Sequence, residues 1–146
     1  MSKLNIAGLD DIVDLHYRYQ MSKLDVTTEK NRTVLQNIDK VSGDLGRESG
    51  MLLQYFKKYF GTGFVLKNSK YSTTKKISSA EFQTALKEFI EYGVLCPSCR
   101  LPETHLSANK SNVNIQCDCC GYNDKININN VNSKSMKDLL TNMMKN

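Results

Sequence analysis

The chain has 146 residues, 40% hydrophobic content and a formal net charge of +5. No apolar run approaches the roughly 20 residues that span a bilayer, which excludes an integral membrane protein, and the length suits one domain with a small satellite. The N-terminus shows no signal-segment pattern, and the odd count of 5 cysteines argues against a disulfide framework. We therefore expect a cytoplasmic monomer that does not contact membranes.

The N-terminal part of the chain carries one weak periodic signal. Residues 9–16 have apolar side chains at the spacing of a short amphipathic helical turn, and the polar residues after them predict an extended or mobile stretch. We expect residues 1–24 to form a flexible tail. Residues 32–37 then alternate like a strand, and residues 38–45 are typical of a helix that Gly46 ends.

The middle of the chain has stronger patterns. Apolar side chains recur at helical spacing over residues 49–60, and Gly61 marks the end of that helix. Residues 64–66 and 71–77 predict a hairpin that turns at Asn68-Ser69.

A second long helix follows the hairpin. Ser78 and Glu81 form a capping box that predicts its start, and Gly93 predicts its end. Its apolar stripe is predicted to be buried and comprises Phe82, Ala85, Leu86, Phe89 and Ile90. Residues 25–94 are therefore expected to form one α/β module.

The remainder divides into a small β-rich unit over residues 95–132 and a C-terminal helix within residues 133–146. We expect the helix itself over residues 137–144 because its apolar residues fall on one side. Strands of the β-rich unit are predicted at residues 104–107, 113–116 and 125–129.

Four cysteines carry the clearest chemical signal. They occur as Cys96-Pro97-Ser98-Cys99 and within Cys117-Asp118-Cys119-Cys120, and two such pairs predict a four-cysteine zinc ribbon. Gly121 and the matching gap favour Cys96, Cys99, Cys117 and Cys120 as the ligands, although Cys119 competes with Cys120 in this pattern. Four thiolates leave no open coordination position, so the zinc is structural. It would supply roughly 10–16 kcal/mol of apparent binding free energy to a unit with little apolar burial.

Basic residues are concentrated between the two long helices. Residues 49–80 contain no acidic residue, and they contain Lys57, Lys58, Lys67, Lys70, Lys75 and Lys76. With the aromatic residues interleaved among them, these lysines predict an RNA-binding surface. The other interpretation is a solvated lysine face over a packed aromatic core.

Motifs for catalysis are absent from the sequence. His16 and His105 are far apart and lack a surrounding catalytic pattern, and Gly61-Thr62-Gly63 lacks the lysine and serine of a phosphate-binding loop. We therefore expect no enzyme and no nucleotide site of the chain's own.

Several short motifs resemble one family when they are taken in order. They are Tyr17-Arg18-Tyr19-Gln20-Met21, Lys58-Tyr59-Phe60-Gly61, Leu95-Cys96-Pro97-Ser98-Cys99 with Pro102-Glu103-Thr104, and Cys117 to Tyr122. Together they resemble the N-terminal domain of eukaryotic translation initiation factor 5, a domain pair that also occurs in the beta subunit of initiation factor 2. The resemblance implies an α+β fold, in which a small initiation-factor-like α/β module precedes the zinc ribbon.

The same resemblance implies a role and partners. A factor 5-like protein binds the preinitiation complex on the small ribosomal subunit, with initiator tRNA or rRNA nearby. It promotes hydrolysis of the GTP that the gamma subunit of initiation factor 2 holds during start-codon selection. The family's candidate arginine finger, which is supplied in trans, corresponds to Arg18, and two supporting basic residues correspond to Arg32 and Lys58.

Two departures keep other functions open. The segment from Gly46 to Leu53 is longer than in factor 5 and is more similar to the factor 2 beta subunit. We also expect no counterpart of the helical-repeat domain that factor 5 carries. One alternative is therefore a beta-subunit-like protein that binds the GTPase or RNA without activating hydrolysis. The other is a generic zinc-ribbon RNA-binding module.

Overall fold

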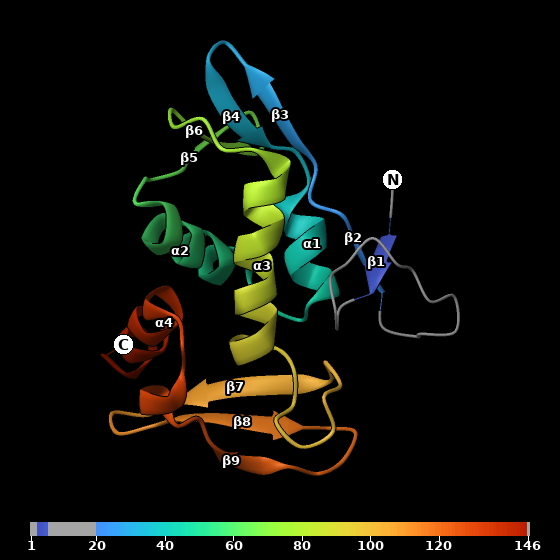
Figure 1. The fold of residues 1–146 in the computed structure, drawn as a ribbon, viewed down its shortest axis with the longest axis vertical. Coiled ribbons are helices and arrows are strands. Elements are labelled where there is room, and N and C mark those ends of the chain that lie inside the picture. The colour runs from blue at the N-terminus through green and yellow to red at the C-terminus, as the bar shows by residue number, and fades with distance from the viewer. Residues whose placement is uncertain (1–2, 6–19, 146) are drawn as a thin grey trace.

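Figure 1 shows the chain as a computed structural model, which describes residues 3–5 and 20–145. The helical turn predicted at residues 9–16 and the arginine at position 18 lie outside the described residues. The described part contains a two-stranded sheet, a four-stranded sheet, a three-stranded ribbon and four α-helices. The helices α1 and α2 come between the two hairpins of the four-stranded sheet, α3 comes between that sheet and the ribbon, and α4 follows the ribbon.

The four-stranded sheet is antiparallel, and its spatial strand order differs from the order along the chain. From one edge to the other, its strands are β3 (Val26–Glu29), β4 (Arg32–Leu35), β6 (Lys70–Thr73) and β5 (Val65–Lys67). Both of its hairpins turn through two residues with positive φ, Lys30 and Asn31 in one and Asn68 and Ser69 in the other, as type I′ turns require. The strand predicted at residues 32–37 is confirmed as far as Leu35, and the predicted hairpin at Asn68-Ser69 is confirmed.

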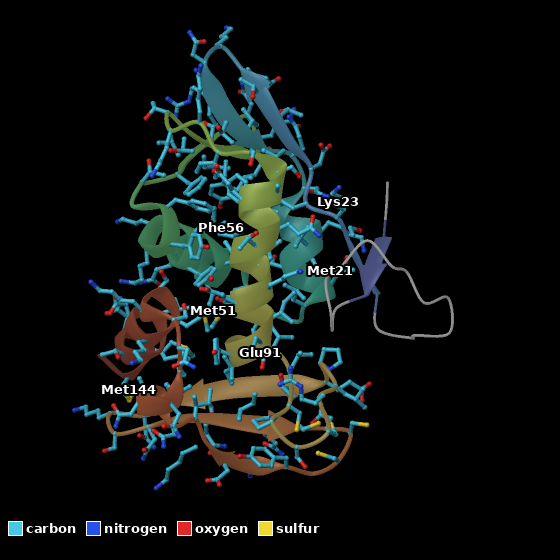
Figure 2. The ribbon with its side chains drawn as sticks, in the orientation of Figure 1. Met21, Lys23, Met51, Phe56, Glu91 and Met144 are labelled. Atoms are coloured by element: carbon cyan, nitrogen blue, oxygen red, sulfur yellow. The ribbon has the colours of Figure 1, made fainter. Side chains whose placement is uncertain are left out.

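Three helices share one buried core with Leu35 of this sheet: α1 (Ile38–Asp44), α2 (Ser49–Phe60) and α3 (Ser79–Gly93). The capping prediction is confirmed, because the Ser78 side chain accepts a hydrogen bond from the N–H of Glu81 at 3.2 Å. In Figure 2, Phe56 lies between α2 and α3, and its ring centroid is 5.0 Å from that of Phe82. The stripe predicted for α3 is buried in full.

The N-terminal strands correct one prediction. Strand β2 (Gln20–Ser22) pairs with β1 (Lys3–Asn5), Met21 is buried in the core, and the Ser22 N–H donates to Asp44 Oδ2 at 2.8 Å. The flexible tail predicted for residues 1–24 is therefore wrong for residues 20–24, because Met21 and Leu24 exchange solvent for apolar contacts.

Asp44 makes this anchor sensitive to acid. Burial alone would raise its pKa, but hydrogen bonds from Lys40 and from the backbone of Ser22 outweigh burial and lower it. A depressed carboxyl pKa stabilises the fold above the unfolded-state value of about 4, and the contribution disappears as pH falls through the folded value. In urea unfolding, we expect the contribution of Asp44 to the free energy of unfolding to be about 1 kcal/mol smaller at pH 3 than at pH 6. Asp44→Asn should remove that difference, and an unchanged pH dependence in this variant would contradict the assignment.

The ribbon consists of β7 (Thr104–Ala108), β8 (Val113–Cys117) and β9 (Asn123–Lys125), paired in that order. The first two strands confirm the prediction. The third strand lies earlier than the predicted residues 125–129, because Asn127 caps a short 3-10 turn by accepting a hydrogen bond from the N–H of Asn129. Capping by the Asn127 side chain therefore favours a turn over the strand that the sequence pattern predicted for this segment.

The C-terminal helix α4 (Lys134–Lys145) begins one turn earlier than predicted. The Ser133 hydroxyl accepts a hydrogen bond from the N–H of Met136 at 3.3 Å and also donates to Glu88 on α3 at 2.9 Å. Figure 1 shows α4 beside α2, between the module and the ribbon. Met136, Leu139 and Leu140 are buried in one core that includes all three helices of the module and Val113 of the ribbon. The ribbon and the module are therefore joined by continuous apolar packing.

Candidate metal centre and nucleic-acid interface

Four cysteine sulfurs converge at one end of the ribbon. The Sγ atoms of Cys96, Cys99, Cys117 and Cys120 all lie within 4.8 Å of one another. Two of the separations, Cys96 to Cys120 and Cys99 to Cys117, are 3.6 Å. A tetrahedral zinc with ligand distances near 2.3 Å would separate its sulfurs by about 3.8 Å. The spacing and the all-thiolate donor set therefore fit a closed tetrahedral zinc site.

The two cysteine pairs have equivalent backbone turns. Cys96 Sγ accepts hydrogen bonds from the N–H groups of Ser98 and Cys99 at 3.3 and 3.5 Å, and Cys117 Sγ accepts one from Cys119 at 3.4 Å. The residue after each second ligand is left-handed, with φ of +63° at Arg100 and +80° at Gly121. Each of these residues donates its N–H to the carbonyl of the first cysteine, at 2.9 and 3.1 Å. N–H donors favour thiolate over thiol, so both turns are organised for metal ligation.

Cys119 lies outside this group of sulfurs and is exposed. Gly121 occupies the same position in its turn as Arg100 does in the first, which aligns Cys120 with Cys99. The geometry therefore favours the pairing that the glycine predicted. It also shows that the left-handed position can be filled by arginine, which the sequence pattern does not reveal.

Arg47 connects the module to the ribbon. Its Nε and Nη2 donate to the carbonyl of Gly93 at 3.1 and 2.7 Å, and its Nη1 and Nη2 donate to the carbonyl and hydroxyl of Thr104, both at 2.8 Å. Gly93 ends α3 and Thr104 begins β7. The cation therefore satisfies carbonyls at a helix C-terminus, where positive charge is favourable. Burial lowers the pKa of Arg47 to about 10, which leaves it charged at neutral pH.

Replacing Arg47 by methionine should reduce the free energy of unfolding by about 3 kcal/mol, because the side chain keeps its stem but leaves buried carbonyls unpaired. Chemical denaturation would measure the change. Arg100→Met is a matched control, since Arg100 pairs with Glu91 while both side chains are about half exposed (50% and 45%), and it should cost at most about 1 kcal/mol. Equal losses in the two variants would show that Arg47 is an ordinary surface arginine.

Some of the predicted basic residues line one groove. The register pairs Glu29 with Arg32 and Lys67 with Lys70, and it places all four on the outer face of the sheet. The groove there has a volume of about 500 Å³ with Val34 and Val65 among its lining residues. The Arg32 Nε is held by the Ser72 hydroxyl at 3.1 Å. This groove is electropositive, with one carboxylate at its rim.

The other predicted lysines lie elsewhere. Lys57 and Lys58 occupy the last turn of α2, and Lys75 donates to the carbonyl of Phe60 at 2.6 Å near the same helix end. Lys76 is exposed one residue further on. The structure thus divides the predicted surface into a sheet groove and a helix-end cluster. The strand register decides which lysines line the groove, and the sequence pattern does not reveal that register.

The aromatic residues between these lysines are mainly core residues. Tyr55, Phe56 and Phe60 are buried, with exposed fractions of 0%, 0% and 9%. These three rings are not available for stacking on bases, because they pack against α3. For the aromatic side chains, the core interpretation is the correct one.

Among the described residues, the group that could hold a metal ion consists of cysteines alone, and His105 is not part of it. His105 is exposed and contacts the Asp118 carboxylate across β7 and the second cysteine turn, while His16, like Arg18, lies outside the described residues. In the part of the chain that the structure describes, no helix is long and apolar enough to cross a membrane.

Comparison with known proteins gives consistent matches. A sequence model of the eIF-5/eIF-2B family, described as the domain found in initiation factors 2B and 5, matches residues 10–123. The chain is 33% identical over 127 residues to eukaryotic translation initiation factor 5 of Caenorhabditis elegans, which is 80% of this chain and 28% of that protein. It is 34% identical over 130 residues to the probable eukaryotic translation initiation factor 5 of Schizosaccharomyces pombe, with coverages of 84% and 32%.

A shorter relative is matched over most of its own length. The chain is 26% identical over 105 residues to translation initiation factor 2 subunit beta of Haloarcula marismortui, which is 71% of this chain and 78% of that protein. The chain thus spans less than a third of the two factor 5 relatives above, at 28% and 32% of their lengths, and more than three quarters of this one.

Proposed function

Because this chain belongs to the eIF-5/eIF-2B family, we propose that it is a factor 5-like protein of translation initiation. In this role it binds the preinitiation complex on the small ribosomal subunit and promotes GTP hydrolysis by initiation factor 2. The observation that carries the proposal is the identity of 33–34% to factor 5 proteins over 80–84% of the chain, which covers both the module and the ribbon.

The metal in this proposal is a structural zinc ion. Cys96, Cys99, Cys117 and Cys120 would hold it, and the close sulfur spacing supports that assignment. A closed four-thiolate site has no position for substrate, so the ion contributes folding free energy and no reaction step. Chemistry on GTP then depends on side chains outside the ribbon.

Arg18 is the proposed arginine finger. An arginine supplied in trans stabilises the charge that spreads over the transferring phosphoryl oxygens. The described chain nearest to this residue is anchored, because Met21 is buried in the core.

Arg32 and Lys58 are the proposed supporting residues on the factor 2 side. Arg32 lines the sheet groove beside Lys67 and Lys70, whereas Lys58 lies at the end of α2. The groove supports a second role, which is contact with phosphates of rRNA or initiator tRNA. Lys57, Lys75 and Lys76 would form a second electropositive area at the helix end that also contacts phosphates.

The groove lysines should contribute to RNA affinity through phosphate contacts. We expect Lys67→Glu with Lys70→Glu to weaken binding of a single-stranded RNA at least tenfold and to reduce the slope of log affinity against log salt concentration by about 1.4. Fluorescence anisotropy across a salt series measures both quantities. Lys87→Glu with Lys110→Glu, which changes the net charge equally outside the groove, is the control. Equal losses in the two double variants would mean that net charge rather than the groove binds RNA.

A beta-subunit-like role is the second candidate. It is favoured by the match to 78% of the archaeal beta subunit. In that role the chain would bind the gamma subunit or RNA without activating hydrolysis. The third candidate, a generic zinc-ribbon RNA-binding module, would show neither gamma-subunit binding nor a preference for the small ribosomal subunit over random RNA.

One reconstituted experiment separates these candidates. GTP hydrolysis is followed in preinitiation complexes with and without the wild-type chain, and binding to the isolated gamma subunit is measured in parallel. Stimulated hydrolysis supports the factor 5-like role. Gamma-subunit binding without stimulation supports the beta-subunit-like role, and the absence of both leaves the generic module.

A further inference from the structure

The four-stranded sheet has two edges of very different character. Edge strand β3 presents Thr27, Thr28 and Glu29, whose polar side chains are typical of a protected edge. Edge strand β5 instead carries Val65 and Leu66, which are 56% and 57% exposed and are the exposed large hydrophobic residues of the described chain. Of the two described edges of this sheet, β5 therefore offers the more exposed apolar side chains.

The backbone of β5 also has groups available for pairing. In a hairpin with a two-residue turn, the residues that flank the turn, here Lys67 and Lys70, form a hydrogen-bonded pair. The next residue, Leu66, then lies in a non-hydrogen-bonded position opposite Tyr71, so its N–H and C=O point away from β6. These groups face outward at the sheet edge.

On both faces of the sheet, the side chains of β5 are suited to pack beside those of a strand added at this edge. Val65 and Lys67 lie on the outer face with Arg32 and Lys70, and Leu66 lies on the opposite face with Tyr71. Residues 49–80 contain six lysines and no acidic residue. A complementary strand would therefore be aliphatic opposite Val65 and Leu66 and acidic opposite Lys67.

We propose that the β5 edge binds an extended acidic and aliphatic segment of a partner protein by strand addition. This inference goes beyond the role in GTP hydrolysis and does not depend on it. A nucleic acid lacks a peptide backbone to pair with Leu66 and gains most from aromatic surfaces, whereas β5 offers aliphatic ones. A second copy of this chain would bring two Lys67 side chains to the same edge, where like charges repel.

The test uses the full chain and a synthetic peptide, acetyl-Thr-Glu-Val-Val-Glu-Thr-amide. Binding is followed by NMR through backbone amide shifts and hydrogen exchange. We expect shifts confined to residues 64–67 and their neighbours on β6, with exchange at Leu66 slowed at least tenfold at saturation. The amides of β3 provide an internal control and should not change.

Three further samples make the test decisive. A peptide N-methylated at both valines cannot pair and should not bind, and a peptide with lysine in place of glutamate should bind at least tenfold more weakly. Leu66→Thr should weaken peptide binding at least threefold and leave RNA affinity unchanged, which separates this edge from the basic groove. Equal binding of the methylated peptide, shifts that appear only around Arg32 and Ser72, or self-association through Leu66 without peptide binding would each overturn the proposal.

Discussion

Removal of the metal by a chelator should unfold the ribbon and loosen α4, while the four-stranded sheet and α1 remain folded. The four sulfurs lie within 4.8 Å of one another, and without a cation their thiolate forms repel. A structural zinc supplies roughly 10–16 kcal/mol of apparent free energy, which is comparable to the whole stability of a domain. Loss of the ribbon also removes Val113 and Val131 from the core that contains Met136 of α4.

Hydrogen exchange of the chelated protein would measure this effect. We expect the amides of β7, β8 and β9 to lose at least a thousandfold in protection, those of α4 to lose less, and those of β4 and β6 to change little. Two adjacent substitutions provide a matched pair: Cys120→Ser should reproduce the effect and lower the bound metal content, and Cys119→Ser should do neither. A metal-free chain with a fully protected ribbon would contradict the structural role.

Elements with strong local signals were predictable from the sequence. The helix α3 has a side-chain cap at Ser78 and an uninterrupted apolar stripe, and both are formed by residues close together in the chain. The same holds for the cysteine turns, in which each pair and its following left-handed residue lie within five positions. Such patterns depend on short-range geometry alone.

Features that depend on long-range contacts were not predictable. Nothing near Arg47 indicates that its partners are Gly93 and Thr104, which lie 46 and 57 residues away. Met21 is buried in a core to which α1, which lies beside β2, contributes. The division of the lysines between a sheet groove and a helix end depends on strand register, because a shift by one residue moves a side chain to the other face.

Replacement of Arg18 by alanine should abolish the stimulation of GTP hydrolysis while the chain remains bound. Arginine fingers supplied in trans contribute about 10³–10⁵ in rate, and a loss of 10³ corresponds to about 4 kcal/mol of transition-state stabilisation. Arg18→Lys should not restore the rate, because an ammonium group lacks the planar fork that contacts two phosphoryl oxygens together. Arg32→Ala and Lys58→Ala should have smaller effects, as expected of supporting residues.

The binding control is essential because a weaker complex also lowers the observed rate. Arg18→Ala should bind preinitiation complexes within about twofold of wild type, since Met21 and the Ser22 to Asp44 hydrogen bond still anchor the strand. Asp44→Ala removes that hydrogen-bond acceptor and should therefore anchor β2 less firmly and reduce the stimulation of GTP hydrolysis. Higher concentrations of this variant should recover part of the rate.

The most direct test of the proposed function is the single-turnover rate of GTP hydrolysis in preinitiation complexes saturated with wild type or Arg18→Ala. We predict that wild type accelerates hydrolysis and that the variant reduces the accelerated rate about a thousandfold or to the unstimulated rate. Equal rates with the two proteins would contradict the role of Arg18 and, if neither rate exceeds that without the chain, the activator function itself.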